Sequence, residues 1–342
     1  MIRLWVDADW GEGWSESIIR WVTQFFETHN HADIEIILFG CKNKIEEILA
    51  SQRVTEKLRD KIKIINCKEQ IWDYFKPEGK NWIKKDASLT MLITSLGGSE
   101  NESNEVLLDG WLSAGNTAAF VMWAILKHGR WERKMPVFLA SWFPNSKSPD
   151  VLAWDMWAIP DIKSEEIRNI ALMLRAYCKA RFNELVPTYL LNIWVETWKG
   201  WRQQQDFFTT LSELEYFHGN VEPESLLNTQ RWTRAGEVME NGRKIILADA
   251  FTMNIALKSI KAWALYVLQK IPYLGKILQK FSTWKSGGAL LLGVNTTLVK
   301  VNGNSTPDIV ANALWELYEA VKSDIITCTK EELESLRIPL ET

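Results

Sequence analysis

Short apolar runs alternate with longer amphipathic stretches along most of this 342-residue chain, and no other feature constrains the fold as strongly. The short runs suit buried strands, whereas the longer stretches space their apolar residues three and four positions apart, as helices do. Strands are expected at residues 2–6, 34–39, 62–65, 106–108, 137–139, 189–193 and 245–247. Helices are expected at residues 15–28, 44–49, 87–96, 117–127, 164–179 and 308–322.

This alternation predicts a doubly wound α/β/α sandwich, in which helices cover both faces of a mostly parallel sheet. A further helical stretch at 254–281, interrupted at Ile271-Pro272, suggests a helical excursion over residues 255–285. No linker or change of composition divides the chain, so we expect a single domain over residues 1–342. Ligands of such sheets bind at the carboxyl ends of the strands, and the loops after the strands therefore matter most.

Composition excludes several classes of protein. The chain is 46% hydrophobic and 24% charged, which is typical of a soluble globular protein. Its net charge of -3 creates no global positive field, so we expect no nucleic-acid partner. It contains no apolar run long enough to span a membrane, and its first residues do not resemble a secretory signal, so we expect a cytoplasmic protein. Four widely spaced cysteines argue against a zinc site and against disulfides.

Four polar loops follow predicted strands and are candidates for chemistry. They cover residues 7–12, 113–117, 191–200 and 249–254. The second loop precedes a helix, whose N-terminal N–H groups favour anions. The third contains Lys199, which could neutralise a phosphate or polarise a carbonyl group. Taken singly, each loop is also compatible with an ordinary helix cap or a solvated lysine.

The order and spacing of these segments resemble the acyl-ACP:phosphate acyltransferase family, whose fold is related to phosphate acetyltransferases and isopropylmalate-type dehydrogenases. The resemblance covers nearly the whole chain. It is carried by Val6-Asp7-Ala8 with Gly11, Lys84-Lys85-Asp86-Ala87-Ser88, Ser113-Ala114-Gly115-Asn116-Thr117, Leu191-Asn192-Ile193 with Lys199-Gly200, Gly219-Asn220-Val221-Glu222, Asp249 with Phe251-Thr252 and Asn254, Gly287-Gly288-Ala289 with Leu292-Gly293-Val294-Asn295, and Lys300, Gly303 and Ser305.

The resemblance implies transfer of a fatty acyl group from acyl carrier protein to inorganic phosphate, without a metal or redox cofactor. The product, an acyl phosphate, would pass to a membrane acyltransferase of phospholipid synthesis, and the enzyme would be a homodimer. By the same resemblance, Lys199 and Asn254 are the expected catalytic residues. The residues expected to bind phosphate or the acyl group are Asp7, Gly11, Ser113, Gly115, Asn116, Thr117, Asn220 and Thr252.

The helical excursion combines apolar residues with lysines from Lys261 to Lys285 and contains no acidic residue. Such a stretch suits the surface of an anionic membrane, and it equally suits a helix pair at a dimer contact. The resembled family associates peripherally with membranes. Lysines of this stretch, or the pair Lys84-Lys85, are candidates for docking the acidic acyl carrier protein.

The sequence departs from the family where glycines are expected. Trp10, Trp157 and Trp194 stand at such positions, and tryptophan (19) outnumbers glycine (18) in the chain. Either a UGA codon that encodes glycine has been read as tryptophan, or the protein is an altered relative. Ala118, Ala250 and Met253 also replace glycines, and codon recoding does not explain them. Two further alternatives are an inactive relative that binds acyl carrier protein or membrane, and a dehydrogenase of related fold.

Overall fold

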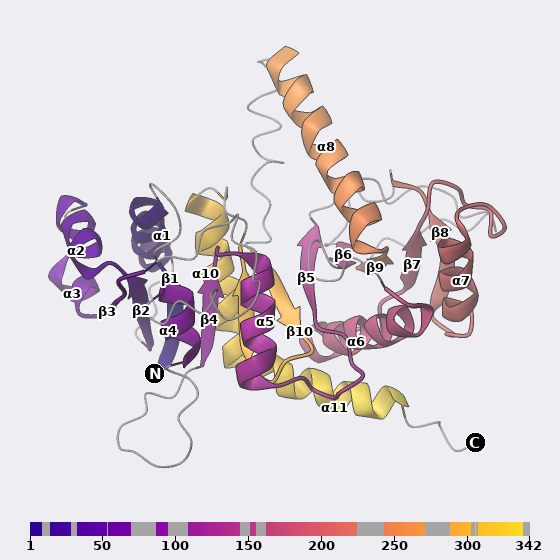
Figure 1. Cartoon of the computed structure of the whole chain (residues 1–342), viewed down its shortest axis with the longest axis horizontal. Helices are drawn as coiled ribbons and strands as arrows, with labels where there is room; N and C mark the ends of the chain where they lie inside the picture. The colour runs from indigo at the N-terminus through magenta and orange to yellow at the C-terminus, as the bar shows by residue number, and fades with distance from the viewer. Residues whose placement is uncertain are drawn as a thin grey trace. The chain divides into compact units, whose positions relative to one another are not determined.

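The computed structural model describes residues 1–8, 14–28, 33–52, 54–69, 87–94, 109–143, 151–154, 162–223, 243–270, 288–301, 305 and 307–337. The chain divides into two compact units, each taken by itself below (Figure 1). Unit 1 comprises Met1–Trp131 and Gly287–Ile326, and unit 2 comprises Glu132–Ser286 and Thr327–Thr342. The single domain expected over residues 1–342 stays a prediction.

The sheet of unit 1 is mostly parallel, as predicted. Its strands lie in the order β3-β2-β1-β4-β11-β10, and β10 alone among them runs antiparallel to its neighbour β11. Every residue of β2 is buried, which agrees with its continuous apolar sequence. The bounds are β1 Ile2–Asp7, β2 Ile34–Gly40, β3 Ile62–Asn66, β4 Gly110–Ser113, β10 Ala289–Leu292 and β11 Thr297–Lys300.

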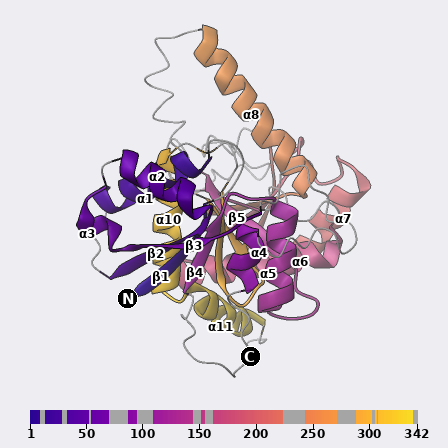
Figure 2. The ribbon, with the colours of Figure 1, turned by 60° about the vertical axis from the view of Figure 1, so that its left-hand side comes forward.

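Helices cover both faces of this sheet. Two consecutive residues of β4, which face opposite sides, contact different helices. The ring of Trp111 lies 5.0 Å from that of Phe120 in α5, whereas a Cβ added to Gly110 would lie 2.8 Å from Leu317 of α10. Figure 2 shows α1 and α10 on one side of the sheet and α4 and α5 on the other. The helices of this unit are α1 Trp14–Thr28, α2 Lys42–Ser51, α3 Glu56–Arg59, α4 Ser88–Thr94, α5 Thr117–His128 and α10 Pro307–Lys322.

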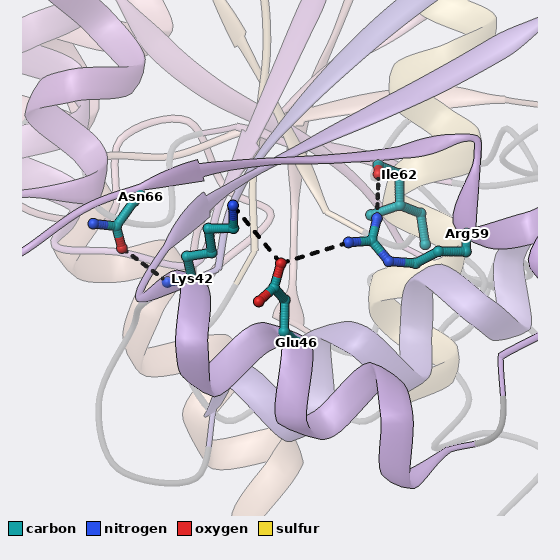
Figure 3. Close-up of polar contacts among 5 residues, drawn as sticks. All are labelled: Lys42, Glu46, Arg59, Ile62 and Asn66. Carbon is teal, nitrogen blue, oxygen red and sulfur yellow. Dashed lines mark hydrogen bonds and ion pairs between the residues drawn. The ribbon is translucent and has the colours of Figure 1, made fainter.

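A polar network connects α2, α3 and the edge strand β3 (Figure 3). Glu46 lies 3.8 Å from both the Lys42 ammonium and the Arg59 guanidinium. Arg59 also donates to the carbonyl of Ile62, and the Lys42 backbone N–H donates to the Asn66 side chain. These ion pairs are solvated, so each stabilises the fold by at most about 1 kcal/mol. Lys42 therefore has a local structural contact and is a useful control residue.

In unit 2 the strands lie in the order β5-β6-β9-β7-β8. β5 and β6 are antiparallel, and the other pairs are parallel. Helix α6 packs against β9 and α7, whereas α8 begins beside β6 and then extends away from the sheet of this unit (Figure 1). The bounds are β5 Phe138–Phe143, β6 Val151–Trp154, β7 Thr188–Leu191, β8 Phe217–Val221, β9 Lys244–Leu247, α6 Ser164–Phe182, α7 Arg202–Leu211 and α8 Ala250–Lys270; α11 (Ile325–Arg337) begins at the end of unit 1.

The structure corrects one predicted strand and leaves others untested. The strand expected at 189–193 ends at Leu191, and Ile193 is 55% exposed because the chain turns at Asn192. The strand expected at 106–108 and the excursion beyond Lys270 lie outside the described residues. Helix α8 ends directly before Ile271-Pro272, where an interruption was predicted. Within the described ranges, no helix is both long and apolar enough to cross a membrane.

Candidate active site

Asp7 is buried at the carboxyl end of β1 in unit 1. Its Oδ1 accepts a hydrogen bond of 2.6 Å from the Ser88 hydroxyl, and its Oδ2 accepts one of 2.9 Å from the Ser113 hydroxyl. Ser88 begins α4 and Ser113 ends β4, so one carboxylate joins three segments that are far apart in sequence. The hydroxyl donors replace the water that the buried carboxylate has lost.

The Ser113 hydroxyl has no proton left to donate to a phosphate. A carboxylate only accepts hydrogen bonds, so the single hydroxyl proton of Ser113 points to Asp7. The same oxygen accepts a hydrogen bond of 2.9 Å from the backbone N–H of Gly115. Ser113 therefore shapes the turn at 113–117 rather than supplying a donor to a ligand.

Asn116 is the N-cap of α5, as one interpretation of this loop predicts. Its Oδ1 accepts a hydrogen bond of 3.0 Å from the backbone N–H of Ala119. The first N–H groups of a helix, here beginning at Thr117, have no partner within the helix and carry its positive dipole end. The cap is thus compatible with anion binding at the same turn, which stays a prediction for Gly115, Asn116 and Thr117.

Lys300 adds a buried cation to this edge of the unit 1 sheet. It ends β11 directly opposite Ser113 and is 4% exposed. Because β1 and β11 are the two neighbours of β4 and all three are parallel, Asp7, Ser113 and Lys300 share one face at the carboxyl ends of these strands. Its Nζ donates to the carbonyl of Val301.

In unit 2, a hydrogen-bonded turn follows β7. The Asn192 side chain accepts from the backbone N–H of Ile193 at 2.8 Å, and its Nδ2 lies 3.5 Å from the carbonyl oxygen of Lys199. Gln205 of α7 donates to the carbonyl of Gly200, which has a φ of +112°. This left-handed conformation suits glycine, so the sequence at Gly200 helps to fix the position of Lys199.

Lys199 lies on the surface of this turn. Its Nζ is 3.1 Å from Glu196 Oε1, and the two side chains are 44% and 27% exposed. An ion pair this exposed holds the ammonium weakly, at most about 1 kcal/mol. Lys199 is therefore accessible to a ligand, as a catalytic lysine must be.

Asp249 caps the N-terminus of α8 in unit 2. Its Oδ1 accepts from the backbone N–H of Thr252 at 2.9 Å, and its Oδ2 accepts from the Thr252 hydroxyl at 2.5 Å and from Gln204 Nε2 at 3.2 Å. The Thr252 hydroxyl therefore donates its only proton to a hydrogen bond within the cap. Asn254, in the same first turns of α8, is partly exposed.

Two tryptophan positions and one glycine of the predicted site, Trp10, Trp157 and Gly11, lie outside the described residues. Trp194 is described, and its side chain is 37% exposed. Among the non-glycine residues that the structure describes, a positive φ occurs only at Asn183 and Asp324. The backbone φ at Trp194 therefore does not require glycine, and the hypothesis of a recoded glycine at this position stays a prediction.

Known proteins resemble this chain in sequence and in fold. The sequence model of the family described as "fatty acid synthesis protein" matches residues 3–328. The chain belongs to this family. Its relatives include the phosphate acyltransferases of Bacillus pumilus, 27% identical over 97% of this chain and 98% of that protein, and of Nitratiruptor, 28% identical over 98% and 99%. The chain is accordingly an enzyme of the phosphate acyltransferase family.

Solved structures agree with the predicted fold. A branched-chain phosphotransacylase from Enterococcus faecalis has a TM-score of 0.60 and 10% identity, with coverage of 94% of this chain and 99% of that chain. A phosphotransacetylase from Streptococcus pyogenes has a TM-score of 0.55 and 15% identity, with coverage of 97% and 94%. At these identities the likeness shows the fold alone, and it confirms the predicted phosphate acetyltransferase-like sandwich.

The structure brings some predicted site residues of this family member together and adds others. In unit 1, Asp7, Ser113 and Gly115 form one hydrogen-bonded chain. In unit 2, Thr252 and Asp249 interact directly, whereas the Asn220 side chain has no hydrogen-bond partner among the described residues. The sequence prediction of site residues omitted Ser88, Gln204 and Lys300. Ser88 and Lys300 lay within matched segments, but Gln204 carried no signal because α7 was not predicted.

Proposed function

We propose that this enzyme transfers a fatty acyl group from acyl carrier protein to inorganic phosphate and so forms acyl phosphate for phospholipid synthesis. Support comes from the match over residues 3–328 and from relatives that are phosphate acyltransferases over nearly their whole length. The structural observation that carries the proposal is Lys199, an exposed ammonium on a hydrogen-bonded turn at the carboxyl end of β7.

The proposed reaction requires no redox step. A phosphate oxygen attacks the thioester carbonyl carbon, the C–O bond forms, and negative charge develops on the carbonyl oxygen. The C–S bond then breaks, and the thiolate leaves and takes up a proton. Lys199 and Asn254 are proposed to stabilise the developing negative charge, which an ammonium and an amide donor do more strongly in the transition state. In unit 1, the N-terminus of α5 is proposed to bind phosphate.

Acyl phosphate formation from acyl carrier protein thioester and phosphate tests this proposal directly. Lys199→Ala should lower kcat by about 100-fold, the scale of removing one oxyanion donor. Lys42→Ala is the matched control, because Lys42 is also an exposed lysine in a local ion pair with a glutamate (Figure 3). Unchanged turnover in Lys199→Ala would remove Lys199 from the mechanism. Carrier binding without any turnover in the unaltered protein would instead favour an inactive relative.

We propose peripheral membrane association and a homodimer as further properties of the enzyme. On α8, Phe251, Ile255 and Tyr266 are exposed, and so are Lys258 and Lys270. An exposed helix with apolar and basic residues and no acidic residue suits an anionic bilayer surface. Sedimentation with anionic liposomes at low salt should retain the protein, and neutral liposomes should not. The molar mass in solution, measured by light scattering, tests the dimer.

A further inference from the structure

The side-chain amide of Asn220 is buried in β8 without a hydrogen-bond partner. Asn220 is 4% exposed, and neither its Oδ1 nor its Nδ2 has a partner in the part of the chain that the structure describes. Rotating the Asn220 amide so that its oxygen and nitrogen change places does not alter this conclusion, because both atoms are unpaired. Buried polar groups are nearly always hydrogen-bonded, since leaving one unpaired destabilises the protein. An amide in this state is prepared for a ligand that supplies both a donor and an acceptor.

Gln204 offers an unpaired acceptor at the same end of this unit. Its Nε2 donates to Asp249 Oδ2 at 3.2 Å, and its Oε1 has no partner among the described residues. Asp249 also accepts two hydrogen bonds from Thr252, so it acts as a carboxylate and cannot donate. The orientation of the Gln204 amide is therefore fixed, and its oxygen remains available to a donor.

Strand register and one hydrogen bond place these groups at the same end of the unit 2 sheet. Leu190 of β7 pairs with Asn220 of β8 on one side and with Leu247 of β9 on the other. Asp249 lies two positions beyond Leu247, just past the carboxyl end of β9, and caps α8. The hydrogen bond between Gln204 and Asp249 then brings α7 to this end of the sheet. Asn220 and Gln204 thus belong to one cluster at the carboxyl ends of β8 and β9.

Asn192 provides a second spatial link within the cluster. A Cβ built on Gly200 would lie 3.2 Å from Asn192 Nδ2 and 3.5 Å from Gln204 Cβ. The side chains of Asn192 and Gln204 therefore both lie near the backbone of Gly200, the residue that follows Lys199. The unpaired amide atoms lie close in the fold to the turn that carries the proposed catalytic lysine.

The chemistry of these atoms distinguishes between ligands. Phosphate at neutral pH offers mostly oxygen acceptors and carries negative charge, so it suits two neutral amide oxygens, Gln204 Oε1 and Asn220 Oδ1, less well than an N–H donor does. A thioester has no N–H group and leaves both oxygens unpaired. A secondary amide supplies one N–H and one carbonyl, which complement an unpaired acceptor such as Gln204 Oε1 and an unpaired donor such as Asn220 Nδ2. The pantetheine arm that carries activated acyl groups contains such secondary amides.

We infer that Asn220 and Gln204 bind secondary amide groups of the pantetheine arm of the acyl donor. This inference rests on the proposed acyl transfer and specifies which part of the donor the cluster in unit 2 recognises. The arm is common to acyl carrier protein and coenzyme A, so the cluster recognises the chemistry that both donors share. Preference between them must come from contacts outside this cluster.

A series of acyl donors tests the inference. Donors with one acyl chain are compared as thioesters of acyl carrier protein, coenzyme A and ethanethiol, the last of which has no amide. Asn220→Leu and Gln204→Met should raise KM for the two pantetheine donors about 10-fold, a typical effect of losing a buried hydrogen bond. KM for phosphate and for the ethanethiol ester should not change. Gln203→Met is the matched control on α7, because Gln203 donates to the Ile162 carbonyl instead.

Four results of this series would overturn the inference. One is an equal rise of KM for the ethanethiol ester, another is a rise of KM for phosphate, and the third is an unaltered KM for both pantetheine donors. The rise of KM in Asn220→Leu is not expected to come from unfolding. This substitution removes an unpaired buried amide, so the urea midpoint should stay unchanged or rise. An effect confined to one pantetheine donor would show recognition of the carrier and would also contradict the inference.

Binding of free pantetheine separates this inference from the proposed function. Ligand-observed NMR should detect pantetheine binding to the unaltered protein and weaker binding to Asn220→Leu. If pantetheine binds in this way but no acyl phosphate forms, the proposed function fails and the amide site stands. If acyl phosphate forms but pantetheine binds equally to both proteins, the amide site fails and the proposed function stands.

Discussion

In unit 1 the buried Asp7 carboxylate accepts hydrogen bonds from two hydroxyl groups, whereas in unit 2 the buried Asn220 amide has no partner among the described residues. The first arrangement is complete without a ligand, because Ser88 and Ser113 replace water around the charge. The second is incomplete, and Gln204, at the same end of the unit 2 sheet, also has an unpaired oxygen. The difference indicates that the Asp7 network holds the strands and turn in place, whereas the Asn220 cluster is arranged for a ligand.

The largest expected effect is on the complete network. Asp7→Ala leaves two buried hydroxyls without an acceptor and should lower the free energy of unfolding by about 2–4 kcal/mol. Urea unfolding measures the change, and Asp60→Ala, at an exposed position after α3, provides the control. A loss as small as that of Asp60→Ala would mean that the Asp7 network does not hold unit 1 together.

A buried lysine extends the contrast in unit 2. Lys244 of β9 is 1% exposed, and its Nζ has no partner among the described residues. Burial lowers the pKa of Lys244 from 10.5 to about 8. Because the unfolded chain binds the proton more tightly, the wild-type protein gains stability as the pH rises from about 8 to 10.5.

Replacing this lysine should therefore stabilise the protein. Lys244→Met keeps the length of the side chain and removes the charge, and it should raise the free energy of unfolding at pH 7 by about 1–3 kcal/mol. The advantage should shrink at pH 10, where the lysine of the folded wild-type protein is mostly neutral. Urea unfolding at the two pH values measures both changes. A destabilised variant at pH 7 would show that the ammonium has a favourable role in the folded state.

The turn that carries Lys199 is expected to be sensitive to one methyl group. Gly200→Ala places a side chain at a φ of +112° and within 3.2 Å of Asn192 Nδ2, which should cost about 1–2 kcal/mol. Gly219→Ala is the control for stability, since its φ is +99° but a Cβ there meets nothing within 4 Å. Urea unfolding should show a larger loss for Gly200→Ala. Equal losses would mean that backbone strain alone acts and that Asn192 accommodates the methyl group.

Hydrophobic periodicity was sufficient to predict that helices cover both faces of the sheet and to locate several of its strands. β1, β2, β3 and β9 are continuous apolar runs, and their positions were predicted to within about two residues. Strands such as β8, with the sequence FHGNV, contain polar residues and glycine and were not found. Helix α7 was missed for a related reason, because RQQQDFFTTL presents few apolar residues.

The predicted site was limited by information that lies outside local sequence. Spacing identified the loops after β1, β7 and β9, because these loops follow recognisable strands, and it identified the loop after β4 although the strand before that loop was expected at 106–108. It could not show that the Ser113 hydroxyl donates its hydrogen bond to Asp7, or that the Asn220 amide is left unpaired, since both depend on contacts distant in sequence.

The recoding hypothesis is tested by mass spectrometry of peptides from the native protein. It predicts glycine masses at positions 10, 157 and 194, and tryptophan masses there would contradict it.

The smallest expected effect concerns Trp194, which lies in the same turn as Lys199. If its indole obstructed the site, Trp194→Gly would increase acyl phosphate formation. The side chain is 37% exposed and the backbone is not left-handed, so we expect no increase in turnover and a stability loss of at most about 1 kcal/mol from added backbone freedom. Turnover and urea unfolding of the same preparation measure both quantities. A clear gain in kcat would show that the Trp194 indole obstructs the turn that carries Lys199. The difference between the two units would then reflect a blocked site in unit 2 rather than a site arranged for a ligand.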